Sequence, residues 1–193
     1  MNREARLPLP DGHTSASAYR PQMAQAIGAL YRASIRAGEV DPVMLEVVRI
    51  RCARVHDCRR CKAARSVTAH DAGVDEAMLD GVDLYEDSAF PERLKVALRY
   101  TDAFVTRPGE ISPTLRRDLH AHFAPSEIVA ISLLIVNFSL HKPAITLGTD
   151  GDPGGNETIA WFDFDAAGDV VFLHDEADAD TDAPSDPARA AVS

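Results

Sequence analysis

The chain is poor in cysteine, in long apolar runs and, over most of its length, in net charge. Three cysteines occur among 193 residues, and this small, odd number argues against the disulfide framework of a small secreted domain. The longest apolar stretch, residues 128–138, is interrupted by Ser132 and Asn137 and is shorter than the ~18 residues that span a bilayer. The opening residues, MNREARLPLPDGH, have no apolar run typical of a signal peptide. We therefore expect a cytoplasmic protein with no membrane segment.

The low net charge of the main part of the chain excludes another class of function. From Asp150 onward there are twelve acidic residues and one basic residue, Arg189, whereas residues 1–149 carry 18 acidic and 19 basic side chains. The formal net charge of −10 therefore comes from the C-terminal part. Because the remainder has no basic patch with interspersed aromatic residues, we expect no binding to nucleic acid.

The spacing of apolar residues predicts an all-α fold for residues 19–148, after an extended lead-in over residues 1–18. Met23, Ile27, Leu30 and Ile35, for example, recur at helical spacing. Asp41 followed by Pro42 is a typical helix start. We expect no strand before residue 150. The predicted helices span residues 19–37, 42–55, 58–72, 75–79, 91–105, 113–123 and 127–147, the last kinked at Pro143.

The sequence changes character after Gly148. Residues 149–174 combine a linker rich in glycine and aspartate with two β-type segments, 158–164 and 170–174, which predict a short hairpin. Residues 175–193 consist largely of alanine, aspartate and proline, and this composition predicts a disordered acidic tail.

The two closely spaced cysteines, Cys58 and Cys61, are the main candidates for chemistry. The predicted helix begins at Cys58, and a helix N-terminus lowers the pKa of a thiol. Arg59, Arg60 and Arg65 add positive charge that favours the thiolate. Cys61 lies three residues later, on the same helix face and within reach of a disulfide bond. The pattern indicates a reactive dithiol.

The cysteine spacing has two other interpretations. Two cysteines occur at this spacing by chance in many proteins. A zinc site would recruit Cys52 and His56, but four ligands within ten residues cannot easily surround one tetrahedral ion, and the sequence has no second Cys-x-x-Cys pair. We therefore expect no metal and no other cofactor.

Glu46 supports the redox interpretation. It precedes Cys58 by twelve residues, and its carboxylate would face the thiols if the two helices formed an antiparallel pair. A carboxylate there would accept a thiol proton, directly or through water. The alternative is a solvated surface charge.

These motifs resemble the carboxymuconolactone decarboxylase family, and most closely its alkylhydroperoxidase D-like branch. The matching segments are LEVVRIR at residues 45–51, CRRC at 58–61 and GVDE at 73–76. The segment that begins with SEIV at 126–129 and the opening RLPLP at 6–10 are also similar. The likeness extends over roughly residues 5–148.

The resemblance implies an all-helical fold that assembles into homo-oligomers, commonly trimers or hexamers. It also implies a thiol peroxidase or disulfide reductase in which Cys58 and Cys61 form the redox pair and Glu46 assists proton transfer. The partners would be a peroxide or small disulfide substrate and a dithiol reductant. Which cysteine attacks first stays open.

The sequence departs from the family pattern where that pattern has a proton-relay histidine, four residues after the second cysteine. Here the position is Arg65. An arginine holds a thiolate and pairs with Glu46, but it passes no proton because it stays charged. Peroxide turnover would then be weak while thiol exchange survives, and Arg65→His would raise turnover. His56 is the candidate to replace the relay. His141 is a further candidate, with core packing as the favoured alternative.

Two other functions fit the same fold. A non-catalytic or redox-sensing protein would keep Glu46 and Arg65 as a structural ion pair and register oxidation of the cysteines. A lactone decarboxylase would not need the cysteine pair, so its presence argues against that activity.

Overall fold

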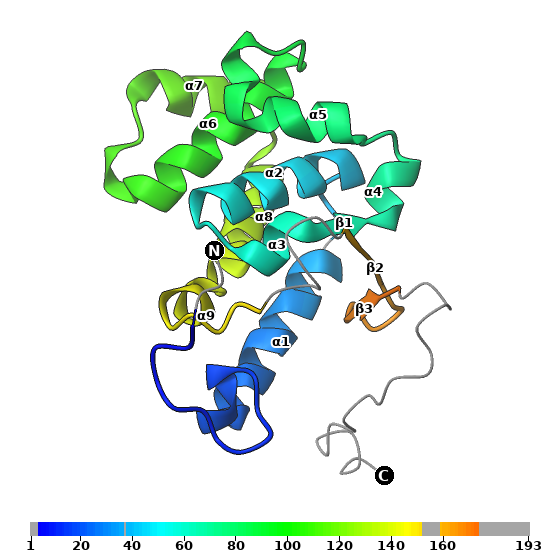
Figure 1. Ribbon diagram of the computed structural model, residues 1–193. Helices are drawn as coiled ribbons and strands as arrows, with labels where there is room; N and C mark the ends of the chain where they lie inside the picture. The colour runs from blue at the N-terminus through cyan, green and yellow to red at the C-terminus, as the bar shows by residue number, and fades with distance from the viewer. Residues whose placement is uncertain (1–3, 37, 152–158, 174–193) are drawn as a thin grey trace.

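The mostly helical fold that the sequence predicts is confirmed. The computed structural model describes residues 4–36, 38–151 and 159–173 (Figure 1). The helices are α1 Pro21–Arg36, α2 Pro42–Val55, α3 Arg59–Ala63, α4 Val67–Asp71, α5 Glu76–Asp80, α6 Glu92–Thr106, α7 Pro113–His122, α8 Pro125–Ser139 and α9 Lys142–Thr146. Short 3₁₀ turns occur at η1 Ala16–Tyr19, η2 Gly81–Asp87 and η3 Pro108–Glu110. The strands are β1 Ala64–Ser66, β2 Ala160–Phe164 and β3 Val170–Phe172. The predicted acidic tail, residues 175–193, lies outside the described residues, as does most of the predicted linker.

Helix α2 is the central element of the body. It begins where the sequence predicts, because the Asp41 carboxylate accepts a hydrogen bond from the backbone N–H of Met44 at 2.9 Å. The helix packs against α6 and α8 (Figure 1). Val47, Val48 and Ile50 are at most 1% exposed, and each such buried side chain contributes about 1.5–3 kcal/mol of hydrophobic stabilisation. The residues that α2 carries are therefore held in a rigid frame.

The predicted helix over residues 58–72 is wrong, and so is the expectation of no strand before residue 150. The segment divides into α3, the strand β1 and α4. Strand β1 pairs in parallel with β2, with Ala64 opposite Ala160 and Ser66 opposite Phe162. The Ser66 hydroxyl then accepts from the backbone N–H of Ala69 and caps α4. A distant strand thus overrides the local helical preference of the segment.

The last predicted helix, residues 127–147, is also divided. Helix α8 ends at Ser139 and α9 begins at Lys142. Pro143 has no N–H with which to continue the helical hydrogen bonds, and the break lies just before it. The stretch Pro125–Thr146 is long and apolar enough, by length and composition alone, to cross a membrane. In the fold α8 packs against α1, α2 and α6, and core helices of other proteins pass the same test of length and composition.

The predicted hairpin is confirmed as β2 and β3, which pair with Phe162 opposite Phe172. In its turn the Asp165 carboxylate accepts from the backbone N–H groups of Ala167 and Asp169 at 2.8 and 2.9 Å. Gly168 follows with φ +79°, a conformation that glycine adopts without strain. The sheet order is β1-β2-β3, so the hairpin extends a strand that belongs to the helical body.

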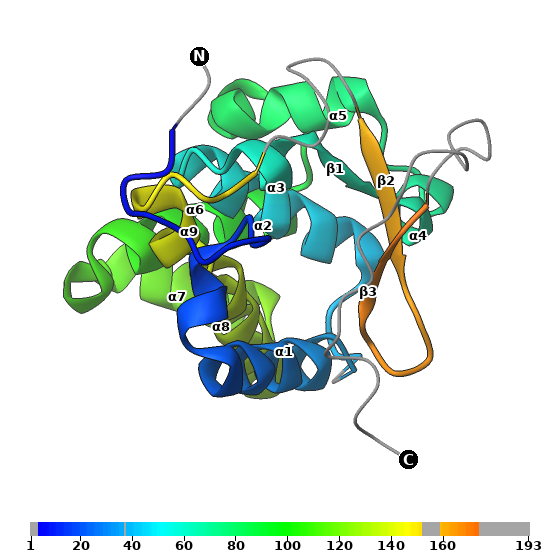
Figure 2. The ribbon, with the colours of Figure 1, turned by 60° about the horizontal axis from the view of Figure 1, so that its bottom comes forward.

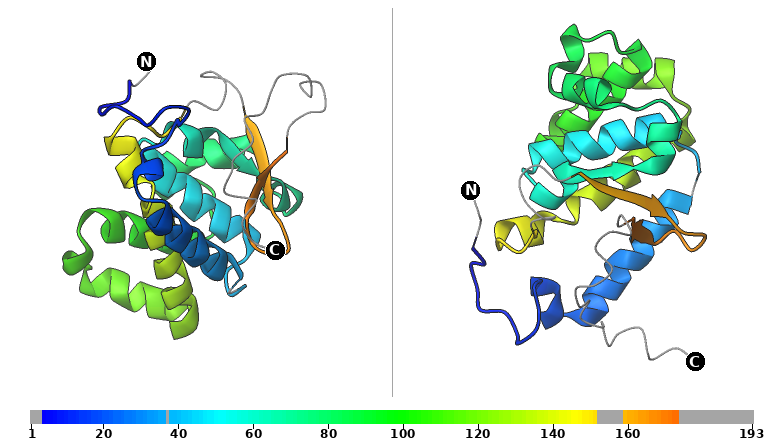
Figure 3. Two further views of the ribbon diagram at one scale, coloured as in Figure 1. Left: turned by 90° about the horizontal axis from the view of Figure 1, so that it is seen from below. Right: turned by 45° about the vertical axis from the view of Figure 1, so that its right-hand side comes forward.

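The hairpin lies beside the helical body, next to α1. Figure 2 shows its turn close to α1, where Arg32 donates to the carboxylate of Asp169 at 2.8 Å. Both views of Figure 3 show the hairpin, in orange, on the side of the body away from the green α6 and α7. The hairpin and α1 therefore flank the segment that carries the two cysteines.

Candidate active site

Cys58 and Cys61 form a disulfide bond at the start of α3. Cys58 is the residue before the first turn of α3, and its sulfur accepts a hydrogen bond from the backbone N–H of Cys61 at 3.3 Å. Asp57 precedes it in the left-handed region, with φ 55°, which aspartate tolerates better than most residues. Cys58 is 3% exposed, whereas Cys61 is partly exposed. Any reagent from solvent therefore meets Cys61 more readily than Cys58.

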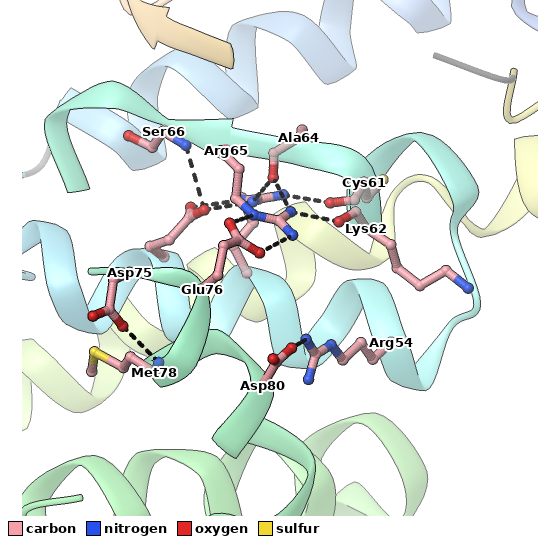
Figure 4. A network of polar contacts seen from close by, with 12 residues as sticks. Arg54, Cys61, Lys62, Ala64, Arg65, Ser66, Asp75, Glu76, Met78 and Asp80 are labelled. Atoms are coloured by element: carbon pink, nitrogen blue, oxygen red, sulfur yellow. Dashed lines mark hydrogen bonds and ion pairs between the residues drawn. The ribbon is translucent and has the colours of Figure 1, made fainter. Parts of the chain in front are cut away.

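A buried ion pair on α2 holds the cysteine segment. The carboxylate of Glu46 receives two hydrogen bonds from Arg49, at 2.7 and 2.6 Å. Arg49 also donates to the backbone carbonyls of Cys61 at 2.8 Å and Ala64 at 2.6 Å. The backbone N–H of Ser66 completes the network with a contact of 3.4 Å to Glu46, and Figure 4 shows Cys61, Ala64 and Ser66 close together along this segment. The pair therefore links α2 to the backbone on both sides of Ala64.

The expected pairing of Glu46 with Arg65 is wrong. Arg65 donates two hydrogen bonds to Glu76, at 2.6 and 3.0 Å, and others to the carbonyls of Lys62 and Ala64 (Figure 4). The hydrogen bonds from Arg65 hold the pKa of Glu76 below its usual range. The physical reason is that Arg49 lies one turn from Glu46 on the same helix and occupies both carboxylate oxygens. The spacing of three residues between Glu46 and Arg49 is visible in the sequence and predicts this contact on one face of a helix.

His56, the predicted substitute for the relay, is hydrogen-bonded to a residue at the end of α8. Its Nε2 shares a hydrogen bond of 3.0 Å with the Ser139 hydroxyl. Burial, aided by the charges of Lys142 and His141, lowers the pKa of His56 to about 4. The imidazole is therefore neutral at pH 7, but it is not among the residues that line the cavity beside the sulfurs.

A cavity of about 500 Å³ adjoins the disulfide, and both cysteines line it. Its walls come from α1, α2, the segment 58–64, the end of α8, α9 and the hairpin. Two arginines of the wall lie against hairpin rings. Arg49 lies 5.2 Å from the ring centroid of Phe162, and Arg60 lies 4.8 Å from that of Phe172. The hairpin is therefore part of the site.

His141 is a site residue for which the sequence favoured a different interpretation, core packing. It lines the same cavity as the two cysteines. Burial, followed by the charges of Arg60 and Arg49, lowers the pKa of His141 below its usual value, so the imidazole is neutral at pH 7 and able to accept a proton. The sequence signal for His141 was its position four residues after Asn137, which would place both side chains on one face of a continuous helix. The helix ends at Ser139, so this helical spacing does not apply to His141.

The remaining charged and sulfur-bearing candidates are arranged differently. Glu46 and Arg65 border a second, smaller cavity of about 250 Å³, which the cysteines do not line. Cys52 is fully buried, and burial raises its pKa to about 12, so it behaves as a small apolar side chain. Within residues 4–36, 38–151 and 159–173, no group of three or more histidine, cysteine, aspartate or glutamate side chains is arranged to hold a metal ion.

Among known proteins, the sequence is similar to relatives that are themselves described as uncharacterized. No protein-family model matches the chain. Over 116 residues the chain is 34% identical to an uncharacterized protein of Mycobacterium tuberculosis, found in two strains. The match covers 60% of this chain and 41% of the relative, so the chain spans less than half of that protein's length.

Solved structures give the fold. The chain is similar to a protein of unknown function from Agrobacterium tumefaciens, a candidate AhpD antioxidant defence protein, with a TM-score of 0.65 and 18% identity. That match covers 79% of this chain and 100% of the other. A peroxidase-related protein from Ralstonia eutropha with an alkylhydroperoxidase AhpD core gives a TM-score of 0.62 at 18% identity, covering 74% of this chain and 77% of its own. The chain therefore has the alkylhydroperoxidase D-like fold that its motifs predict.

Proposed function

We propose that this protein is a thiol-dependent oxidoreductase that reduces a peroxide or a small disulfide with Cys58 and Cys61 as its redox pair. The observation that carries the proposal is the disulfide in the wall of a cavity, with Cys61 partly exposed. Buried cysteines that only fill a core, such as Cys52, lack such access. The AhpD-like structural neighbours support the same chemistry.

In the proposed cycle the reduced Cys61 thiolate attacks one oxygen of the peroxide. The O–O bond breaks, the other oxygen leaves as an alcohol or water after taking a proton, and Cys61 becomes a sulfenic acid. The Cys58 thiol then gives up its proton and attacks the sulfur of Cys61, so that the S–S bond forms, the S–O bond breaks and the hydroxyl group leaves with that proton as water. A dithiol reductant supplies the two electrons and two protons that restore both thiols.

The environment of each sulfur supports this division of roles. Cys61 is the accessible member of the pair, and so it is the sulfur that the peroxide and later the reductant meet. The N–H of Cys61 donates to the sulfur of Cys58, and a hydrogen bond to a thiolate stabilises it as a leaving group. When the reductant attacks Cys61, Cys58 therefore leaves as the stabilised thiolate.

His141 is the proposed proton carrier in place of the family's relay histidine. It is neutral at pH 7 and shares the cavity with both cysteines, so it would take the proton from the Cys61 thiol and return it to the leaving oxygen. Such assistance is typically worth about 10²–10⁴-fold in rate. Arg65 and Glu46 act in this scheme by holding the backbone around the cysteines.

We further propose a cytoplasmic homo-oligomer, a trimer or hexamer. The oligomeric assembly is supported by two large apolar side chains one turn apart on α8, Val129 and Leu133, which are 58% and 46% exposed on the single chain. The reducing conditions of the cytoplasm would supply the dithiol reductant.

A redox sensor is the second candidate. The observation in its favour is the Glu46 carboxylate, which is bonded to Arg49 through both oxygens and so is poorly available for proton transfer. In a sensor, peroxide would oxidise the pair slowly and the disulfide would not be turned over.

One assay separates the two candidates. Consumption of hydrogen peroxide and of tert-butyl hydroperoxide is measured with dithiothreitol as the reductant, for the wild type and for Cys58→Ser, Cys61→Ser and the control Cys52→Ala. The enzyme predicts multiple turnovers that both serine variants abolish and the control retains. Stoichiometric oxidation of the wild type without turnover would identify the sensor and refute the enzyme.

A further inference from the structure

The cavity beside the disulfide is much larger than hydrogen peroxide requires. Its volume is about 500 Å³, whereas a molecule the size of water occupies roughly 30 Å³ in the liquid. Cavities of about 300–1,000 Å³ typically hold organic ligands. Large apolar side chains form much of the wall, and they are Ile27, Tyr31, Phe138, Leu140, Phe162 and Phe172.

The charged side chains of the wall leave one positive charge without a carboxylate partner. Three of them belong to ion pairs with short contacts, and these pairs are Arg49–Glu46, Asp150–Arg59 and Asp169–Arg32. His141 is neutral at pH 7 because burial lowers its pKa. Arg60 is exposed, and within the described part of the chain its guanidinium makes only the contact with the ring of Phe172. The wall therefore favours a ligand that carries negative charge.

Two buried polar side chains of the same wall have no hydrogen-bond partner among the described residues. They are the amide of Asn137, which is 0% exposed, and the hydroxyl of Thr149. Buried polar groups nearly always have partners, and each unpaired group costs about 1–3 kcal/mol. An oxyanion accepts hydrogen bonds from a guanidinium, from the Nδ2 group of Asn137 and from a hydroxyl, so it meets both the positive charge and the unpaired donors, whereas the unpaired Oδ1 of Asn137 needs a hydrogen-bond donor on the ligand.

We propose that this cavity binds an organic oxyanion with an apolar body, its charge met by Arg60 and its body lying on the aromatic and aliphatic wall. The inference deepens the proposed function and rests on it, because the molecule bound against the disulfide would be the substrate or would carry the reacting group. It assigns Arg60 as the residue that selects charged over neutral ligands.

Sodium octanoate and its uncharged counterpart 1-octanol test the proposal on the oxidised full chain by calorimetric titration. Octanoate is expected to bind more tightly than octanol. Arg60→Gln is expected to weaken octanoate binding about tenfold, the effect of losing a charge-assisted hydrogen bond, and to leave octanol binding unchanged. The matched control is Arg116→Gln, which removes the same charge from α7, outside the cavity.

A second readout locates the ligand. Saturating octanoate is expected to slow the reduction of the Cys58–Cys61 disulfide by dithiothreitol, because the ligand covers Cys61, and this protection should fall in Arg60→Gln at the same octanoate concentration. Equal binding of octanoate and octanol, equal effects of the two arginine variants, or reduction at an unchanged rate would each overturn the proposal.

The outcome also separates this inference from the proposed function. The titration uses the oxidised protein and needs no turnover. Octanoate binding with no peroxide turnover would leave the inference standing and refute the enzyme, whereas turnover without selective octanoate binding would refute the inference alone.

Discussion

Removing the charge of Glu46 tests whether its ion pair with Arg49 holds the site together. Glu46 is 1% exposed and Arg49 is 5% exposed, so neither charge is compensated by water. Glu46→Gln keeps the shape of the side chain but removes the negative charge, and its amide group brings N–H donors toward a guanidinium that has only donors. Breaking a buried pair in this way costs about 3–5 kcal/mol, a large part of the roughly 5–15 kcal/mol that stabilises a typical domain.

The cost is measured by urea unfolding of the oxidised protein, followed by circular dichroism. Glu76→Gln is the matched control, because it makes the same chemical change in an ion pair whose carboxylate is 52% exposed. An exposed pair of this kind is worth at most about 1 kcal/mol. The expected difference between the two variants is therefore about 2–4 kcal/mol.

Equal costs for Glu46→Gln and Glu76→Gln would refute this reasoning. They would mean that breaking the Glu46–Arg49 pair costs no more than breaking an exposed pair, and Glu46 would then again be a candidate proton acceptor for the thiols. The double variant Glu46→Met/Arg49→Met extends the test. Because it leaves no unpaired charge, it should be more stable than Glu46→Gln.

Three further predictions concern histidines and Arg65. His141→Gln should lower peroxide turnover by about 10²-fold or more without changing the urea midpoint; an unchanged turnover in a steady-state assay would exclude His141 as the proton carrier. Arg65→His should give no gain in turnover, because Arg65 is bonded to Glu76 and lines a different cavity from the cysteines; a gain would restore the missing-relay hypothesis. The pKa of His56 is about 4 in the folded chain and about 6.5 when unfolded. As the pH falls, the unfolded state therefore takes up the proton at a higher pH than the folded state does. The stabilisation present above pH 6.5 is therefore lost as pH falls toward 4. The full shift corresponds to ~3.4 kcal/mol, which solvent exposure reduces to about 1–2 kcal/mol. Urea unfolding at pH 7 and pH 4.5 should show this loss, and His56→Gln should remove most of it.

The parts of the fold that depend on neighbouring residues could be predicted from the sequence. The start of α2 follows from the Asp41 side chain and the proline beside it, and the hairpin follows from two β-type segments around a turn. The cysteine pair was identified for the same reason, since its spacing is local.

The parts that depend on distant residues could not be predicted. Strand β1 exists because Ala64 and Ser66 find partners in β2, and nothing within residues 58–72 indicates those partners. The partner of Arg65 is Glu76, on the helix α5. Each of these features is decided by tertiary packing, which overrides the local preference of the chain.

The pairing of β1 with β2 has a consequence for how the protein is made. The register joins Ala64 to Ala160, 96 positions later, and at typical synthesis rates of about 5–20 residues per second that interval lasts roughly 5–20 s. Contacts between such distant segments form late in folding. A nascent chain therefore carries its two thiols for seconds before the hairpin that completes the wall of their cavity has been translated.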